Sequence, residues 1–190
     1  MKLVLLFSAL LSVASAVESV AGVRAVSTET IGNGVSAEVP SKWKFESWPM
    51  PLDGYTNFRI YADELKVGIT GFPLPENAPA IPALDNSADS VKEAMGQYLP
   101  DAVETEISPV SFNNGEVSGS YATLSAKKSG NGFVVFPTRS RPSLIYQCVT
   151  TSIVRAKRMW FAISIASNNC LSENHQAAIL MLTTIKQKSG

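Results

Sequence analysis

Alternation of apolar and polar residues through the second half of this 190-residue chain constrains its fold more than any other feature. Side chains on a strand point to opposite faces in turn, so the alternation predicts strands over residues 102–112 and 116–128. Asn113–Gly115 lies between them, and an Asn-Gly pair is a strong signal for a hairpin turn. Residues 143–154 and 159–167 predict another hairpin further along the chain.

The first half of the chain carries similar strand patterns, separated by turn residues. Strands are predicted over residues 35–40, 42–48, 57–62 and 66–72. Pro40 ends the first of them, because proline cannot donate to a sheet ladder. Asp63–Glu64 forms the turn of the predicted hairpin 57–72.

Two segments have helical spacing instead. Residues 86–99 follow a proline-rich loop, 72–85, and stop at Pro100. Residues 172–188 form an amphipathic C-terminal segment with Ser172 as its N-cap. The predicted apolar stripes are Ala88, Val91, Ala94, Met95, Tyr98 and Leu99 in the first helix, and Ala178, Met181, Leu182 and Ile185 in the second. The expected fold class is therefore α+β: an antiparallel β-sheet meander flanked by an internal helix and a C-terminal amphipathic helix.

The N-terminus has the layout of a secretory signal peptide over residues 1–16. Lys2 precedes an apolar run, and Ala14-Ser15-Ala16 is a small-residue cleavage site. We expect residues 17–30 to be a flexible lead-in and residues 31–190 to be a single domain. No cysteine follows the apolar run and no later stretch is apolar for about 18 residues, so neither a lipid anchor nor a membrane span is expected. The predicted location is the periplasm or the extracellular space.

Charge composition argues against one class of partner. The chain has 16 basic and 16 acidic residues, and it lacks the basic excess typical of proteins that bind nucleic acid. No glycine-rich phosphate loop precedes a helix, and no cofactor is expected.

The two cysteines, Cys148 and Cys170, are predicted to form a structural disulfide because exported proteins meet an oxidising compartment. If Arg155 pairs with Arg158, Cys148 lies opposite Ile165, and the bridge then requires the chain to turn back near Ser167. The face of Cys148 is the more apolar one and is expected beneath the C-terminal helix. A redox pair and a zinc site with His175 are the alternatives, and His175 is expected on a solvated helix face.

Residues for catalysis are few. His175 is the single histidine and no serine lies in a G-x-S-x-G motif. Glu104 and Glu106 lie two apart on a predicted strand and so share a face, which motivates a hydrolase-like enzyme as an alternative function. A small-ligand carrier is a further alternative.

Two segments are candidates for a partner surface. Arg155, Lys157 and Arg158 form a basic hairpin tip, for which a solvated turn is the simpler interpretation. Trp48 and Tyr55 bound a loop that contains two prolines. Such a loop forms a recognition surface or simply packs onto the domain.

The segment VSAEVPSKWKF (residues 35–45), the late strand FAISIAS (161–167) and the closing helix resemble the PsbP-like fold group. That group includes the photosystem II subunit PsbP, a Ran-binding nuclear import factor and periplasmic DcrB-like proteins. The resemblance spans residues 31–187 as a layout of elements, and the cysteine pair departs from it. It implies an antiparallel sheet flanked by helices and a non-catalytic accessory or binding role. The expected function is thus an exported, non-enzymatic domain that binds a protein or a cell-envelope component.

Overall fold

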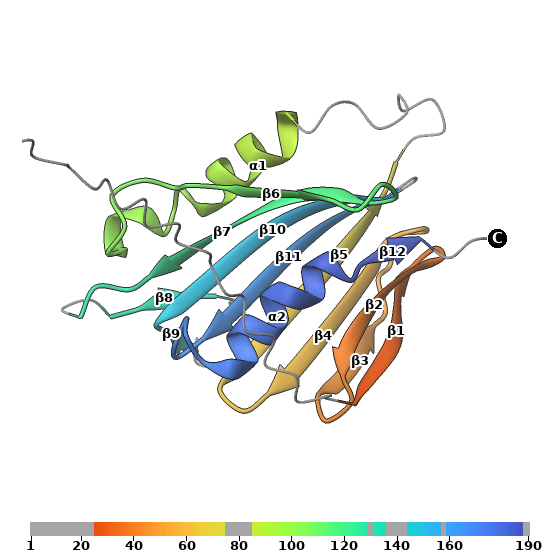
Figure 1. Ribbon diagram of the computed structural model, residues 1–190, viewed down its shortest axis with the longest axis horizontal. Coiled ribbons are helices and arrows are strands. Elements are labelled where there is room, and N and C mark those ends of the chain that lie inside the picture. Colours follow the sequence, from red (N-terminus) through yellow and green to blue (C-terminus); the bar gives the residue numbers. More distant parts are fainter. Residues whose placement is uncertain (1–24, 75–84, 129–130, 136–143, 157–158, 188–190) are drawn as a thin grey trace, which may run out of the picture.

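The fold class predicted from the sequence is confirmed. The computed structural model describes residues 25–74, 85–128, 131–135, 144–156 and 159–187, which form antiparallel sheets with one internal and one C-terminal helix (Figure 1). In chain order the elements are β1 (Val26–Gly32), β2 (Val35–Pro40), β3 (Lys44–Trp48), β4 (Thr56–Ala62), β5 (Leu65–Pro73), α1 (Asp85–Met95), the 3-10 turn η1 (Leu99–Asp101), β6 (Val110–Asn113), β7 (Ser118–Ser125), β8 (Phe133–Val134), β9 (Ile145–Tyr146), β10 (Cys148–Ala156), β11 (Met159–Ser167), α2 (Glu173–Thr183) and β12 (Lys186–Gln187).

The central layer is a seven-stranded antiparallel sheet with the strand order β3-β4-β5-β11-β10-β7-β6. Each predicted hairpin forms a pair of neighbours in it: β4 with β5, β6 with β7, and β10 with β11. The β6–β7 turn contains Gly115 at φ +90°, a conformation that glycine adopts without steric cost. Because the two strands of each pair follow one another in the chain, the alternating pattern and the turn residues between them were enough to predict these pairs.

A second, three-stranded sheet has the order β1-β2-β12. β1 begins at Val26, inside the segment 17–30 expected to be a flexible lead-in, so that expectation is wrong for residues 26–30. The reason is pairing: β1 lies antiparallel to β2, and Ile31 near its end is fully buried. Residues 1–24, which include the predicted signal peptide, lie outside the described residues. β8 and β9 form a separate two-stranded ladder.

The two helices lie on opposite faces of the seven-stranded sheet (Figure 1). α2 and the β1-β2-β12 sheet cover one face, and the main hydrophobic cluster fills the space between them. Its largest members include Ile60, Ile69, Phe161, Ile163, Met181 and Leu182. The sequence correctly placed the more apolar face of β10 and β11 beneath the C-terminal helix, with Ser172 as the N-cap of α2.

On the other face, α1 packs on β7 and β10. Val91 and Met95 of α1 are fully buried there against residues such as Leu124 and Val149. α1 is shorter than the predicted 86–99, because η1 with Pro100 follows it after a turn. No described helix contact covers β3, β4 and β5 on this side, and the outward side chains of these strands and of β11 remain partly or fully exposed, apart from Ala166, which is buried in the cluster beneath α1.

Two strand predictions were wrong in detail. Within the predicted strand 102–112, only Val110–Asn113 pairs as a strand, and Ala102 makes a single bridge to Ala126. Pro109 has no N–H group for a ladder, which fits a strand that starts just after it. The predicted strand 143–154 is interrupted at Gln147, so that β9 pairs with β8 while β10 joins the main sheet.

The register of the last hairpin also differs from the expected one. Ala156 pairs with Met159, and Cys148 therefore lies opposite Ser167 and not Ile165. A shift of two residues in the partner keeps every side chain on its predicted face, because the side-chain period of a strand is two. The face assignment therefore survived the error in the turn.

Candidate functional site

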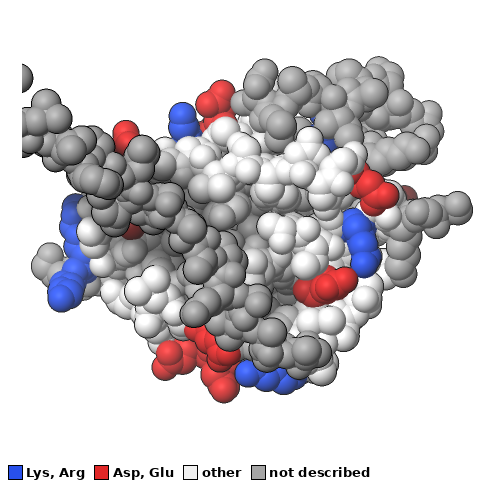
Figure 2. Space-filling view, in the orientation of Figure 1, with Lys and Arg blue, Asp and Glu red and all other residues white. Residues whose placement is uncertain are grey.

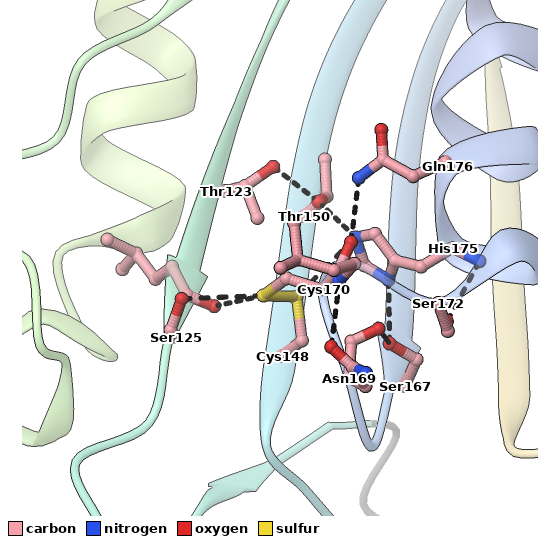
Figure 3. Close-up of a disulfide and its surroundings, with 12 residues drawn as sticks. Thr123, Ser125, Cys148, Thr150, Ser167, Asn169, Cys170, Ser172, His175 and Gln176 are labelled. Carbon is pink, nitrogen blue, oxygen red and sulfur yellow. Dashed lines mark hydrogen bonds between the residues drawn. A yellow bond between two sulfur atoms is a disulfide. The ribbon is translucent and has the colours of Figure 1, made fainter.

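The disulfide between Cys148 and Cys170 is confirmed, with their Cα atoms 5.2 Å apart. Cys148 is fully buried at the start of β10, while Cys170 is partly exposed in the turn between β11 and α2. Figure 3 shows that the bridge joins this turn to β10. The chain leaves the sheet after Ser167 and reverses before α2, which is the path the bridge was predicted to require.

His175 lies beside this disulfide, and the prediction of a solvated histidine is wrong. Its side chain is fully buried in the first turn of α2 and points into the sheet (Figure 3). Nε2 lies 2.9 Å from Thr150 Oγ1 and 3.5 Å from Cys148 Sγ, and Nδ1 lies 2.8 Å from Ser167 Oγ. His175 is three residues before Ala178 and seven before Leu182, so helical spacing was the signal that could have predicted it on the buried stripe.

The neighbouring hydroxyl groups assign the tautomer of His175. Ser167 Oγ donates to the carbonyl oxygen of Asn169 at 3.0 Å, so it accepts from His175 and places the ring proton on Nδ1. Nε2 then accepts from Thr150 Oγ1, whose own acceptor position faces Thr123 Oγ1 at 2.7 Å. Every polar atom of the imidazole therefore has a partner without a charge on the ring.

Burial lowers the pKa of His175 from 6.5 to about 4, since the charged ring would lose its hydration. A neutral ring supplies no positive charge to lower the pKa of a neighbouring thiol, which is what reactive cysteines depend on. Together with the burial of Cys148, this favours a structural disulfide over a redox pair. The disulfide and the hydrogen bonds of His175 to Thr150 and Ser167 connect the start of α2 to β10 and β11.

The two glutamates of the hydrolase alternative do not form a carboxylate pair on a strand. Glu104 lies before β6, and its Oε1 and Oε2 accept hydrogen bonds from the hydroxyl and the backbone N–H of Ser125, at 3.0 and 2.9 Å. Glu106 is exposed outside any strand. The shared strand face that motivated this site is therefore absent, and Glu104 anchors the loop to β7.

The described part of the chain lacks the residue clusters of a metal site. No group of three or more His, Cys, Asp or Glu residues there is placed to hold a metal ion. None of the described helices has the length and apolar character needed to cross a membrane. In the view of Figure 2, acidic and basic side chains of the described residues are scattered and form no large patch of one sign.

A different surface stands out on the opposite side of the sheet. We define the open face as the partly or fully exposed side chains of β3, β4, β5 and β11 that point away from α2; Ala166 of β11 points the same way but is buried and is not part of it. Its side chains alternate with core residues such as Phe58, Val67 and Ile163, so cross-strand register assigns them to this side. The open face consists of Lys44, Glu46, Trp48, Asn57, Arg59, Tyr61, Lys66, Gly68, Thr70, Phe72, Trp160, Ala162 and Ser164.

Aromatic side chains are concentrated on the open face. Trp48, at the end of the edge strand β3, is 44% exposed, and Phe72, near the end of β5, is 39% exposed. Tyr55 packs edge-on against Phe72, with ring centroids 5.7 Å apart. Trp160 lies directly opposite Phe72 in the β5–β11 ladder, so these three rings border one end of the face.

Cations accompany these rings. The Arg59 guanidinium lies over the Trp48 ring, 4.1 Å from its centroid, and the Lys66 ammonium lies 5.9 Å from the centroid of Tyr61. Lys44 forms an ion pair with Glu46 at 2.6 Å, and this contact holds the pKa of the Glu46 carboxyl below its usual range. Glu46 also lies opposite Arg59 in the β3–β4 ladder, so its carboxylate offsets part of the positive charge of the open face.

The residues predicted as a partner surface lie in different parts of the structure or outside the described residues. Trp48 lies on the open face, opposite Asn57 in the β3–β4 ladder, and Tyr55 borders the face through its contact with Phe72. Arg155 is only 6% exposed in β10, with its guanidinium 5.8 Å from the Trp160 ring, so its assignment to an exposed hairpin tip is wrong. Lys157 and Arg158 lie outside the described residues. Sequence reasoning missed Arg59, Lys66 and Trp160 as companions of Trp48, although all three alternate with core residues.

Comparisons with known proteins leave the family open. No protein-family model matches the chain, and neither does any curated protein. A crystal structure of a Bacteroides thetaiotaomicron protein is similar with a TM-score of 0.40 and 12% identity, over 84% of this chain and 48% of that one. This chain thus spans about half the length of that protein. A likeness at this level assigns neither family nor function, and the resemblance to the PsbP-like group stays a prediction.

Proposed function

We propose that this chain is an exported, non-enzymatic binding domain, and that its partner, a protein or another cell-envelope component, binds at the open face. The observation that carries the proposal is the placement of Trp48 and Phe72, both well exposed, on a sheet face that α1 leaves uncovered. A monomeric protein rarely exposes clustered aromatic side chains without a use for them.

The composition of the open face supports this proposal. Trp, Tyr and Arg are the residue types that contribute most to binding energy at interfaces, and the face holds Trp48, Arg59, Tyr61 and Trp160 on three of its four strands. The underlying sheet is held from the other side by the main core, so these side chains project from a rigid base. Export rests on the predicted signal peptide and is compatible with the Cys148–Cys170 disulfide.

Site-specific photocrosslinking in the native organism tests the proposal. A photoreactive residue replaces Thr70, in the middle of the open face, and in a matched control variant it replaces Lys92, on the exposed side of α1. We expect a discrete crosslinked product from position 70, absent from position 92 and lost when Trp48→Ala is added. Equal products from both positions, or none from position 70 while position 92 gives one, would place the binding surface elsewhere.

A further inference from the structure

We propose that this chain forms a twofold symmetric dimer, in which β3 pairs antiparallel with β3 of a second copy and the two seven-stranded sheets join into one. The interaction surface is the outer edge of β3 (Lys44–Trp48), on the side away from β4. The dimer does not depend on the proposed function, but it enlarges the open face that the proposed function uses.

The outer edge of β3 is free to accept another strand. β3 is the last strand of the seven-stranded sheet, and β4 is its single neighbour there. Among the described residues, no backbone hydrogen bond reaches β3 except those of its ladder with β4. Alternate residues of an edge strand direct their N–H and C=O groups away from the sheet, and a second strand satisfies them.

The charges along β3 are self-complementary in one antiparallel register. When Phe45 lies opposite Phe45 of the second copy, Lys44 lies opposite Glu46 of that copy, and the twofold axis repeats this pair with the two chains exchanged. Within one chain Lys44 and Glu46 already form an ion pair on the open face. A carboxylate and an ammonium each bond to more than one partner, so this pair is kept in the dimer. Four charges of alternating sign then lie around the axis.

The same charges disfavour other pairings. A shift of the second copy by two residues puts either Glu46 or Lys44 opposite its own copy, and like charges directly opposite are destabilising. Lysine on an edge strand usually discourages pairing, and here the carboxylate two positions away relieves that effect in one register. Of the other edge strands, β6, β8 and β9 have no charged residue, and β1 and β12 carry charge of one sign only. The pattern of charge therefore selects β3 as the partner of β3.

Phe45 adds an apolar contact at the twofold axis. Its ring stacks on Phe58 with the centroids 5.2 Å apart, and it packs against the main hydrophobic cluster but is only partly buried. In the proposed register the two copies of Phe45 have their Cβ atoms about 5 Å apart, a distance at which aromatic cross-strand pairs stabilise a sheet. Pairing thus removes apolar surface from water that a single chain leaves exposed.

The size of the interface predicts a weak dimer. A strand of five residues is about 17 Å long and a sheet is about 10 Å thick, so each partner buries on the order of 200 Å². Stable complexes bury about 800 Å² on each partner, so we expect a dimer that forms only at high protein concentration. Because the axis is perpendicular to the sheet, the two open faces, roughly 400 Å² each, lie side by side and together reach the area of a typical interface.

Sedimentation equilibrium of the purified protein from about 10 µM to about 1 mM tests the proposal. We expect the wild type to change from monomer to dimer over this range. Lys44→Glu should weaken association at least about tenfold, because it puts like charges opposite each other. The double variant Lys44→Glu/Glu46→Lys should dimerise like the wild type, since it only exchanges the two charges. Lys92→Glu, the same change of charge on the exposed side of α1, should leave association unchanged.

A mixture of two single variants separates pairing from damage to the fold. Lys44→Glu and Glu46→Lys should each associate weakly alone and form a mixed dimer when combined, because each then meets opposite charges. A wild type that is monomeric throughout, or equal effects of Lys44→Glu and Lys92→Glu, would overturn the proposal. Assemblies larger than a dimer would also reject it, since they require different edges to pair head to tail. A partner crosslinked from position 70 to a monomeric protein would leave the proposed function standing and reject only the dimer.

Discussion

At the scale of single residues, the buried side chain of His175, beside the disulfide, should make the stability of the protein depend on pH. Its pKa of about 4 lies below the ordinary value of 6.5, so the unfolded chain binds a proton that the folded chain does not. The folded state therefore has its full stability above about pH 6.5, and it loses up to about 3 kcal/mol as the pH falls towards 4. We expect His175→Asn, which does not titrate, to lack this part of the pH dependence in urea unfolding.

A comparison of the wild type with His175→Asn isolates the contribution of His175 to the pH dependence of stability. Carboxylates also titrate towards pH 4 and change the stability of both proteins alike, so the informative quantity is the difference in the free energy of unfolding between wild type and variant. That difference should narrow as the pH falls from about 6.5 to 4, because only the wild type bears the cost of a buried imidazole. Parallel pH profiles would show that His175 is solvated in the folded protein.

At the scale of elements, the disulfide fixes the turn that leads into α2. It closes a loop between positions 22 apart, and the chain-entropy model assigns such a loop about 3 kcal/mol. We expect the double variant Cys148→Ala/Cys170→Ala to lower the free energy of unfolding by about this amount. Hydrogen exchange should report the largest loss of protection in the first turn of α2, because Cys170 lies just before its N-cap.

The single variant Cys170→Ala separates the bridge from the packing around it. It leaves Cys148 buried as a free thiol and removes only the partly exposed partner, so any further loss in the double variant reports packing at β10. If exchange rises equally in α2 and in β5, the bridge acts on the unfolded chain alone and not on the docking of the helix. A wild type with two free thiols would remove the basis of both measurements.

The elements also show what the sequence could predict and what it could not. Hairpins joined by short turns were predicted well, because alternation and turn residues are local signals. β12 and the β1–β2 ladder were missed, since β12 has two residues and pairs with a strand about 150 positions away. The open face was missed for a related reason: Trp48, Lys66 and Trp160 become neighbours only through the order of the strands.

At the scale of the whole molecule, one sheet separates two hydrophobic clusters that share its strands. Val154 of β10 belongs to the cluster beneath α2, and Val149 of the same strand belongs to the cluster beneath α1. A strand that contributes to both clusters cannot lose one of them without loosening the other. The two sides should therefore unfold together, although the backbone of the sheet lies between them.

Met95→Ala tests this coupling, because Met95 is fully buried beneath α1, on the far side of the sheet from Trp43. Truncation of a buried methionine costs about 2–5 kcal/mol. In a background with Trp48→Phe and Trp160→Phe, fluorescence reports Trp43 alone, and far-ultraviolet circular dichroism reports the whole chain. Both probes should shift to the same lower midpoint in urea, as they do for a single cooperative unit. A fluorescence midpoint that stays in place while the dichroism midpoint falls would show that the α1 side unfolds independently.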